Sequence, residues 1–294
     1  MAKLRLASAM ALFGTIGLFV RSVPLPASVL AMARGLIGTA FLVLAAILGR
    51  RRWDWGTIRK NLLLLVLSGA AIGFNWILLF ASYRYTTVAV ATLCYYLAPV
   101  FVILLSPLVL RERLTAGKLG CVAAALVGMA LVSGVSGDTG GGGQFTGILL
   151  ATGAAALYAS VMLMNKFLKG LDPGDSTTFQ LGAAALVLLP YVLLTEDLGR
   201  IALSPTALGL TLVVGVVHTG LAYRLYFSAL PQLDGQTLAL YSYIDPALAV
   251  VLSALVLGEP LGFSGVLGAA LILGSTLAGE LLGRKEPTVI YTKE

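Results

Sequence analysis

Residues 93–114 read LCYYLAPVFVILLSPLVLRERL, and residues 240–261, half a chain length later, read LYSYIDPALAVVLSALVLGEPL. At this shift of 147 residues, ten of the 22 aligned positions are identical, among them Pro99 with Pro246. Chance matching between segments rich in Leu, Val and Ala would give roughly two or three identities. The sequence therefore predicts that the two halves of the chain are copies of one another.

The segments around this repeat are apolar enough to cross a membrane. Of the 294 residues, 59% are hydrophobic and 11% are charged, whereas a soluble domain is nearer one quarter charged. A membrane-spanning helix needs about 20 largely apolar residues. We therefore expect an all-α polytopic membrane protein with ten transmembrane helices, at residues 6–22, 27–49, 60–83, 86–110, 117–135, 145–166, 176–194, 206–230, 235–257 and 262–283. The connections are short, which argues against a separate soluble catalytic domain.

The charges indicate how these helices cross the membrane. With the N-terminus in the cytoplasm, 16 of the 20 basic residues lie on the cytoplasmic side, three lie opposite, and Arg34 falls within a helix. This is the bias that the positive-inside rule describes. Because five helices per copy is an odd number, the second copy must enter the membrane from the other side. We predict two inverted five-helix repeats, 1–136 and 145–294, joined by a glycine-rich linker at 137–144, with both termini cytoplasmic.

The architecture and the residue types favour a carrier without a cofactor. Inverted repeats are typical of secondary transporters, which bind substrate near the membrane midplane where the two copies meet. Two cysteines, Cys94 and Cys121, and one histidine are too few for a zinc or iron–sulfur site, and the linker lacks the Lys-Ser/Thr of a phosphate-binding loop. The net charge of +7 follows the membrane topology, so we expect no nucleic-acid partner. The expected partners are the lipid bilayer and a small-molecule substrate, with no metal.

The repeated motif also carries a family resemblance. In both copies a proline precedes a glutamate by thirteen residues, at the end of a set of five helices. In this the chain resembles the paired EamA domains of the drug/metabolite transporter superfamily, and within it bacterial amino-acid exporters of the YddG type. The resemblance implies a multi-pass protein of the bacterial inner membrane that exports aromatic and other amino acids by alternating access.

Asp245 is the first candidate for substrate contact. A charged side chain near the centre of a membrane helix costs roughly 2.5–3.5 kcal/mol on insertion scales and marks a functional site by default. It could bind a substrate ammonium group or a proton, or it could lock its helix to a neighbour. Pro99 and Pro246 are predicted to kink their helices, or to serve packing alone. Tyr96 and Tyr243, three residues earlier, share a helix face with them.

Polar and aromatic residues of the third and eighth helices form a second group of candidates. The repeat places Asn75 and His218 on the same face of their respective copies, near mid-membrane. Both could face substrate at the repeat interface, or each could make an interhelical hydrogen bond worth about 0.6–2 kcal/mol. Trp76, Tyr223 and Tyr226 could line an aromatic pocket, or they could simply pack.

Arg34 brings a charge into the second helix. Its guanidinium could bind a carboxylate bidentately, or the side chain could snorkel to the external interface, and we favour the structural role. Small-residue patterns such as Ala124-x-x-x-Gly128 allow close helix approach. They could act within a monomer or between monomers, so the oligomeric state stays open.

Two alternatives to amino-acid export remain. A polyspecific exporter of drugs or cationic compounds would use Asp245 as readily as an amino-acid carrier would. An intramembrane hydrolase built on Ser136 and His218 is disfavoured, because Ser136 lies at the external end of its helix and His218 at mid-membrane. We therefore expect a transporter with no catalytic residues. The sequence has no ATP-binding motif, which leaves proton-coupled or substrate-gradient-driven movement.

Overall fold

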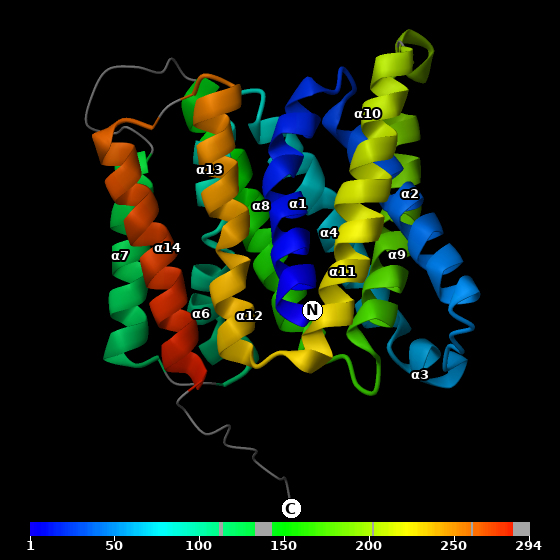
Figure 1. Cartoon of the computed structure of the whole chain (residues 1–294), viewed down its shortest axis with the longest axis horizontal. Coiled ribbons are helices and arrows are strands. Elements are labelled where there is room, and N and C mark those ends of the chain that lie inside the picture. The colour runs from blue at the N-terminus through cyan, green and yellow to red at the C-terminus, as the bar shows by residue number, and fades with distance from the viewer. Residues whose placement is uncertain (112–113, 133–142, 202, 260, 285–294) are drawn as a thin grey trace, which may run out of the picture.

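The computed structural model describes residues 1–111, 114–132, 143–201, 203–259 and 261–284, and regular structure in these ranges is helical throughout (Figure 1). Eight helical stretches of this part of the chain are long and apolar enough to cross a membrane, and Ala116–Val132 and Leu240–Val256 are shorter apolar helices. The expectation of an all-helical, multi-pass membrane protein is therefore confirmed. Ser136 and linker residues 137–142 lie outside the described residues.

Most of the membrane helices are continuous. The long ones are α1 (Ala2–Ser22), α2 (Ala27–Leu48), α4 (Leu62–Ser82), α8 (Gly143–Asn165), α9 (Pro173–Thr195) and α14 (Phe263–Arg284), and α7 (Ala116–Val132) is shorter. A short helix, α3 (Trp55–Lys60), precedes α4 and begins at Asp54, whose side chain accepts hydrogen bonds from two backbone N–H groups of its first turn. An aspartate N-cap supplies acceptors that the helix itself lacks. The third predicted span therefore begins at Leu62, after a separate short helix, and not at residue 60.

Two spans are broken where the sequence predicts kinks. One is divided into α5 (Val88–Tyr95) and α6 (Ala98–Val109), and the other into α12 (Gly235–Ser242) and α13 (Ile244–Val256). Proline has no N–H to donate to the preceding turn but fits the first turn of a helix. Pro99 and Pro246 accordingly lie in the first turns of α6 and α13. The predicted kinks are thus interruptions of one or two residues, at Tyr96 and Leu97 in the first span and at Tyr243 in the second.

The eighth predicted span is also irregular. It consists of α10 (Pro205–Gly215), a π-helical turn η2 (Val216–Leu221), α11 (Ala222–Ala229) and a 3-10 turn η3 (Leu230–Gln232); a further 3-10 turn, η1 (Leu198–Arg200), precedes it. Wider π turns are rare and often occur at functional sites. Nothing in the sequence predicted this one, which contains His218.

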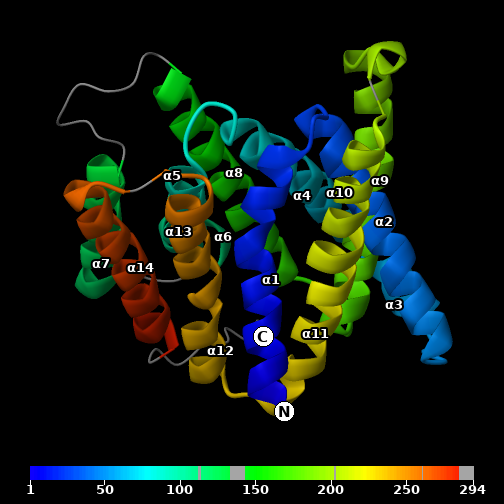
Figure 2. The ribbon, with the colours of Figure 1, turned by 45° about the horizontal axis from the view of Figure 1, so that its top comes forward.

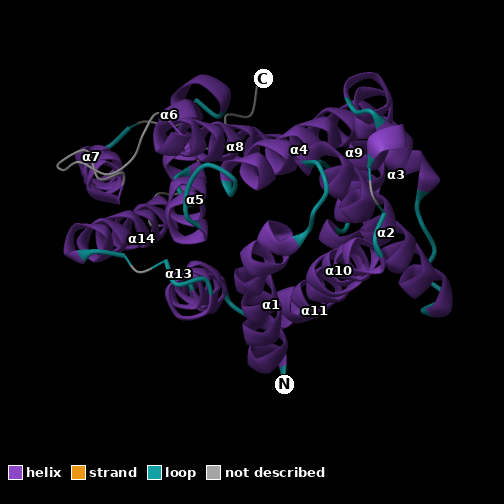
Figure 3. Cartoon of the chain, turned by 90° about the horizontal axis from the view of Figure 1, so that it is seen from above, coloured by secondary structure: helices purple, strands orange, loops and turns teal. Residues whose placement is uncertain are grey.

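The helices pack in a definite set of pairs. α7 packs on α14, α2 on α9, α1 on α13 and α11, and α8 on α4 and α6. Seen from above, α7 and α14 form one end of the molecule and α2 and α3 the other (Figure 3). In the tilted view of Figure 2, α1 stands between α13 and α11. The N-terminus and the last turn of α14 lie at the same end of the bundle (Figure 1).

Glycine makes the closest of these helix contacts possible. A Cβ atom on Gly128 of α7 would lie 2.7 Å from the carbonyl oxygen of Gly268 of α14, and one on Gly268 would lie 2.5 Å from that of Gly128. Small residues allow this kind of backbone approach in membrane proteins. The small-residue pattern at Gly128 therefore acts within the chain. Cys94 and Cys121 are both buried free thiols.

Candidate substrate-binding site

The two broken spans meet at a polar contact. The Tyr96 hydroxyl, at the C-terminal end of α5, donates a hydrogen bond to Asp245 Oδ2 in the first turn of α13, at 2.9 Å. The same hydroxyl lies 3.4 Å from the carbonyl oxygen of Ser242, which Pro246 leaves without its helical donor. Asp245 is only partly buried, and no ion pair engages it among the described residues. Among the described residues, Tyr96 is the side chain that engages this carboxylate.

Arg34 stays inside the bundle. Its side chain is 5% exposed, and its Nε donates to Thr219 Oγ1 of η2 at 2.8 Å. Its guanidinium carbon lies 4.0 Å from the centre of the Trp76 ring and 5.7 Å from that of Phe80, a cation–π arrangement. Snorkelling to the interface is therefore wrong for Arg34, because η2 and α4 hold the charge in the interior.

Asn75 ties α4 to α8. Its Nδ2 donates to the carbonyl oxygen of Ala154 at 2.8 Å and lies 3.3 Å from the Tyr95 hydroxyl, and the residue is 1% exposed. The Tyr95 ring stacks on Tyr158 of α8 at 5.4 Å between centroids. Tyr158 is 39% exposed although it packs on these interior residues. Asn75 thus makes an interhelical hydrogen bond. The neighbouring residue with an exposed side chain is Tyr158.

His218 faces α1 from the π turn. Its Nε2 lies 2.9 Å from the Thr15 hydroxyl, its Nδ1 lies 3.3 Å from the carbonyl oxygen of Val213, and its ring centre is 4.7 Å from that of Phe19. The Thr15 hydroxyl also donates to the carbonyl oxygen of Leu12 at 2.8 Å, and its single hydrogen can serve only one acceptor at a time, so the direction of the Thr15–His218 hydrogen bond follows the tautomer of the ring. His218 and Asn75 therefore contact different neighbours and do not meet at one interface.

The remaining predicted residues separate into two places. The Trp76 ring packs against the Arg34 guanidinium. Tyr223 and Tyr226 belong to a group of aromatic residues on α11, in which both tyrosines contact Phe227. The Tyr223 ring centre is also 5.3 Å from that of Phe13 of α1. The hydroxyl of Tyr243, in contrast, donates to Thr276 of α14 at 3.1 Å. Tyr243 is thereby directed toward α14, so the predicted symmetry of Tyr96 and Tyr243 does not extend to their contacts.

Several residues of the site were not predicted from the sequence. Thr219 holds Arg34, Phe80 borders it, and Tyr95 contacts Asn75. A sequence signal existed for Phe80, which lies one helical turn after Trp76 and so on the same face. No such signal existed for Thr219, because the π turn changes which residues share a face.

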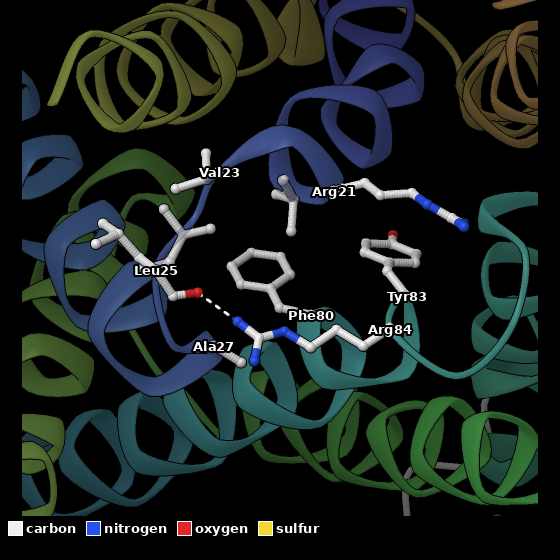
Figure 4. A pocket seen from close by; sticks show the side chains of 9 residues that line it. Arg21, Val23, Leu25, Ala27, Phe80, Tyr83 and Arg84 are labelled. Carbon is white, nitrogen blue, oxygen red and sulfur yellow. Dashed lines mark hydrogen bonds between the residues drawn. The ribbon is translucent and has the colours of Figure 1, made fainter. Parts of the chain in front are cut away.

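A cavity of about 310 Å³ lies beside the C-terminal end of α1. It is lined by Val20, Arg21, Val23, Leu25, Ala27, Leu30, Phe80, Tyr83 and Arg84. Arg84 reaches across it to the carbonyl of Leu25, and the Phe80 and Tyr83 rings lie between the two arginines (Figure 4). A neighbouring hollow of about 270 Å³ shares Arg21 and Arg84. Phe80, which lines this cavity, also lies 5.7 Å from the guanidinium carbon of Arg34.

Glu259 forms bonds to three helices near this cavity. It pairs with Arg21, accepts a hydrogen bond from the Val88 N–H at 3.1 Å, and accepts another from the Ser253 hydroxyl at 2.7 Å. The Val88 N–H belongs to the first turn of α5, where backbone donors lack helical partners. One carboxylate therefore joins the end of α1, the start of α5 and the end of α13.

These features define a class of protein. A bundle of apolar helices, broken at a charged junction and hollowed at one end, is the architecture of a small-molecule membrane transporter. No group of three His, Cys, Asp or Glu side chains that could hold a metal ion occurs in the described part of the chain. The model of the EamA-like transporter family matches residues 3–134 and 145–278. The chain belongs to this family, within the drug/metabolite transporter superfamily.

Individual relatives agree with this assignment. The chain is 31% identical to the uncharacterized transporter YxxF of Bacillus subtilis over 259 residues, covering 87% of this chain and 82% of that protein. It is 30% identical to the threonine/homoserine exporter RhtA of Escherichia coli over 148 residues, covering 50% of this chain and 49% of that protein. A solved crystal structure superposes with a TM-score of 0.65 over 97% of this chain and 98% of the other, at 21% identity, a likeness of fold alone.

Proposed function

We propose that this transporter exports amino acids across the inner membrane of a bacterium by alternating access. The observation that carries the proposal is the Asp245 carboxylate, held by Tyr96 where the two broken spans meet and free to accept a substrate ammonium group. Partial similarity to a threonine/homoserine exporter supports the substrate class. Among the predicted contacts, Asp245, Tyr96, Trp76 and Tyr223 fit this role best. Asn75, His218 and Tyr243 fit helix packing.

The proposed architecture is two inverted five-helix repeats, 1–136 and 145–294. Helix boundaries support it, since the 147-residue shift carries the ends of α5, Val88 and Tyr95, onto the ends of α12, Gly235 and Ser242. The packing pairs support it too. The same shift carries α1 onto α8, and α1 packs on α11 and α13 just as α8 packs on their counterparts α4 and α6. It also carries α7 onto α14 and α2 onto α9, and in each of these two cases the helix packs directly on its own counterpart. Breaks at matched places would let the halves rearrange around the junction.

We propose that both termini are cytoplasmic. The N-terminus and the last turn of α14 share one end of the bundle (Figure 1). Basic residues occur at the same end, where Asn61 hydrogen-bonds the backbone of Lys169 and Arg51 pairs with Asp172 and Asp175. An excess of Lys and Arg is typical of the cytoplasmic side. The cavity at Arg21 and Arg84 then opens to the outside, as in the release state of an exporter.

Transport by purified protein in liposomes tests the proposal. Labelled threonine, homoserine, aromatic amino acids and lipophilic cations would be offered in turn, with empty liposomes as the control. Saturable flux of at least one amino acid is expected. Flux of cations alone would support the second candidate function, a polyspecific exporter of cationic compounds, which the free carboxylate of Asp245 also suits. In that case amino-acid export would be the wrong assignment.

A further inference from the structure

The cavity beside the C-terminal end of α1 combines an apolar lining with a charged rim. Its volume of about 310 Å³ lies at the lower end of the range of about 300–1,000 Å³ that small-molecule sites occupy. Most of the residues that line it are buried and apolar, namely Val20, Val23, Leu25, Leu30, Phe80 and Tyr83. Figure 4 shows the two aromatic rings between the exposed side chains of Arg21 and Arg84, which form the rim. A ligand that fills this cavity therefore needs an apolar part and a group that arginine recognises.

The charges of the two arginines are compensated to different degrees. Arg21 forms an ion pair with Glu259 and also donates to the carbonyl oxygen of Thr86 at 3.4 Å. Arg84 donates from Nη2 to the carbonyl oxygen of Leu25, and no carboxylate of the described residues pairs with it. A carbonyl carries no net charge, and a guanidinium has five N–H donors. The rim therefore keeps one uncompensated positive charge, on Arg84, with N–H donors that no described residue occupies.

A carboxylate matches this arrangement in charge and in shape. Its single negative charge balances the single free charge of Arg84, and its two oxygens fit the planar fork of a guanidinium. The bond to Leu25 holds the Arg84 side chain across the cavity (Figure 4), so part of the cost of ordering a long side chain is met before a ligand arrives. A carboxylate compound with an apolar side group could bury that group against the lining while its charge stays at the rim.

We propose that this cavity binds a small apolar carboxylate, whose charged group pairs with Arg84 and whose side group packs against Phe80 and Tyr83. The proposal rests on the proposed function in one respect, since amino acids with apolar side chains are then the carboxylates that would pass through the cavity. It adds a rule of selection, because Arg84 repels a cation that brings no carboxylate. The site takes no part of its recognition from Asp245, so the two sites can be tested separately.

Binding of 3-phenylpropionate to the purified protein tests the proposal. This ligand has a carboxylate and an aromatic group but no ammonium group, so Asp245 does not attract it. Methyl 3-phenylpropionate, which lacks only the negative charge, is the matched ligand, and isothermal titration calorimetry gives the Kd of each. The variants are Arg84→Gln and Arg84→Lys, with Arg200→Gln, an exposed arginine outside the cavity, as the control variant.

The acid should bind saturably and its ester at least about tenfold more weakly. Arg84→Gln should raise the Kd of the acid at least about tenfold and Arg84→Lys less, whereas Arg200→Gln should keep the original Kd. If Arg84→Gln weakened the acid and the ester equally, Arg84 would serve only to hold Leu25, and the proposal would be overturned. Equal Kd values for acid and ester in the unaltered protein would overturn it without any variant. Tighter binding of decanoate than of 3-phenylpropionate would assign the cavity to a lipid chain and would also overturn it.

The liposome measurement separates this proposal from the proposed function. If amino acids are transported but 3-phenylpropionate does not bind, amino-acid export stands and the carboxylate site at Arg84 falls. If 3-phenylpropionate binds in an Arg84-dependent manner but no amino acid is transported, the carboxylate site stands and amino-acid export falls.

Discussion

The Tyr96 hydroxyl donates to Asp245 Oδ2 at 2.9 Å, and this hydrogen bond joins the break between α5 and α6 to the first turn of α13. Tyr96 comes from the first half of the chain and Asp245 from the second. Gly14 of α1 packs against the backbone of Asp245, since a Cβ atom on Gly14 would lie 2.6 Å from the Asp245 carbonyl oxygen. Three separate segments therefore converge on one acid, and a ligand that draws Asp245 away from Tyr96 would act on all of them.

Replacing Asp245 with asparagine should remove transport without unfolding the protein. The amide keeps the shape and can still accept from Tyr96, but it offers no charge to a substrate ammonium group. Hydrogen bonds to charged groups contribute about 1.5–3 kcal/mol, so flux at low substrate concentration should fall about tenfold or more. Initial rates in liposomes measure this. Asp197→Asn, which alters an exposed carboxylate paired with Arg200, is the control. Normal flux in Asp245→Asn would make the acid structural.

Glu259 is predicted to act more as a helix cap than as an ion-pair partner. Val88 is 1% exposed, and leaving its buried N–H without an acceptor costs about 1–3 kcal/mol. The pair with Arg21 is partly exposed and contributes about 0–1 kcal/mol. Glu259→Gln, which keeps an acceptor, should therefore lower the melting temperature in detergent less than Glu259→Ala does. Equal losses in the two variants would contradict the cap interpretation.

The contact between α7 and α14 should not tolerate a single methyl group. Gly128→Ala places a Cβ atom 2.7 Å from the Gly268 carbonyl oxygen, and overpacking of this kind costs about 1–3 kcal/mol. Gly120→Ala in the same helix meets nothing within 4 Å and is the matched control. Thermal unfolding of the two variants should differ, with Gly128→Ala the less stable. Equal melting temperatures would mean that α7 and α14 separate easily.

Asn75→Ala should destabilise the pairing of α4 with α8. The variant loses the hydrogen bond to the Ala154 carbonyl, and such bonds within membranes contribute about 0.6–1.7 kcal/mol. Unfolding in detergent measures the loss. Ser22→Ala, whose exposed hydroxyl bonds only within its own helix, should leave the melting temperature unchanged. If Asn75→Ala instead raises KM and keeps its stability, Asn75 contacts substrate after all.

The positions of the spans were predictable because they depend on local composition. Apolar length fixes where a helix can cross a membrane, and proline fixes where it must stop, as at Pro99 and Pro246. The π turn at His218 was not predictable from these rules, since nothing in its local sequence excludes an ordinary α-helix. The turn packs closely on α2, where a Cβ atom on Gly220 would lie 2.4 Å from the Phe41 ring.

The candidate site was predicted in part. Asp245 could be predicted as a site residue because a charge at that depth needs a partner or a ligand. Tyr96 was also predicted, but as a residue on the same helix face as Pro99 and not as the hydrogen-bond partner of Asp245. The location of Arg34 could not be predicted from one helix alone. Its side chain is long enough to reach the interface, and the contacts that keep it inside come from α4 and η2. Tertiary contacts decided between the two interpretations.

The burial of Arg34 has a consequence for how the protein is made. Its hydrogen-bond acceptor, Thr219, is encoded 185 residues later, so α2 leaves the ribosome and meets the translocon long before that partner exists. A charge at such a depth opposes insertion by roughly 2.5–3.5 kcal/mol. The apolar residues of α2 must therefore supply enough favourable insertion free energy to outweigh the cost of Arg34. Additional polar substitutions in α2 would then reduce biogenesis of the protein, and its yield in the membrane, before they affect its activity.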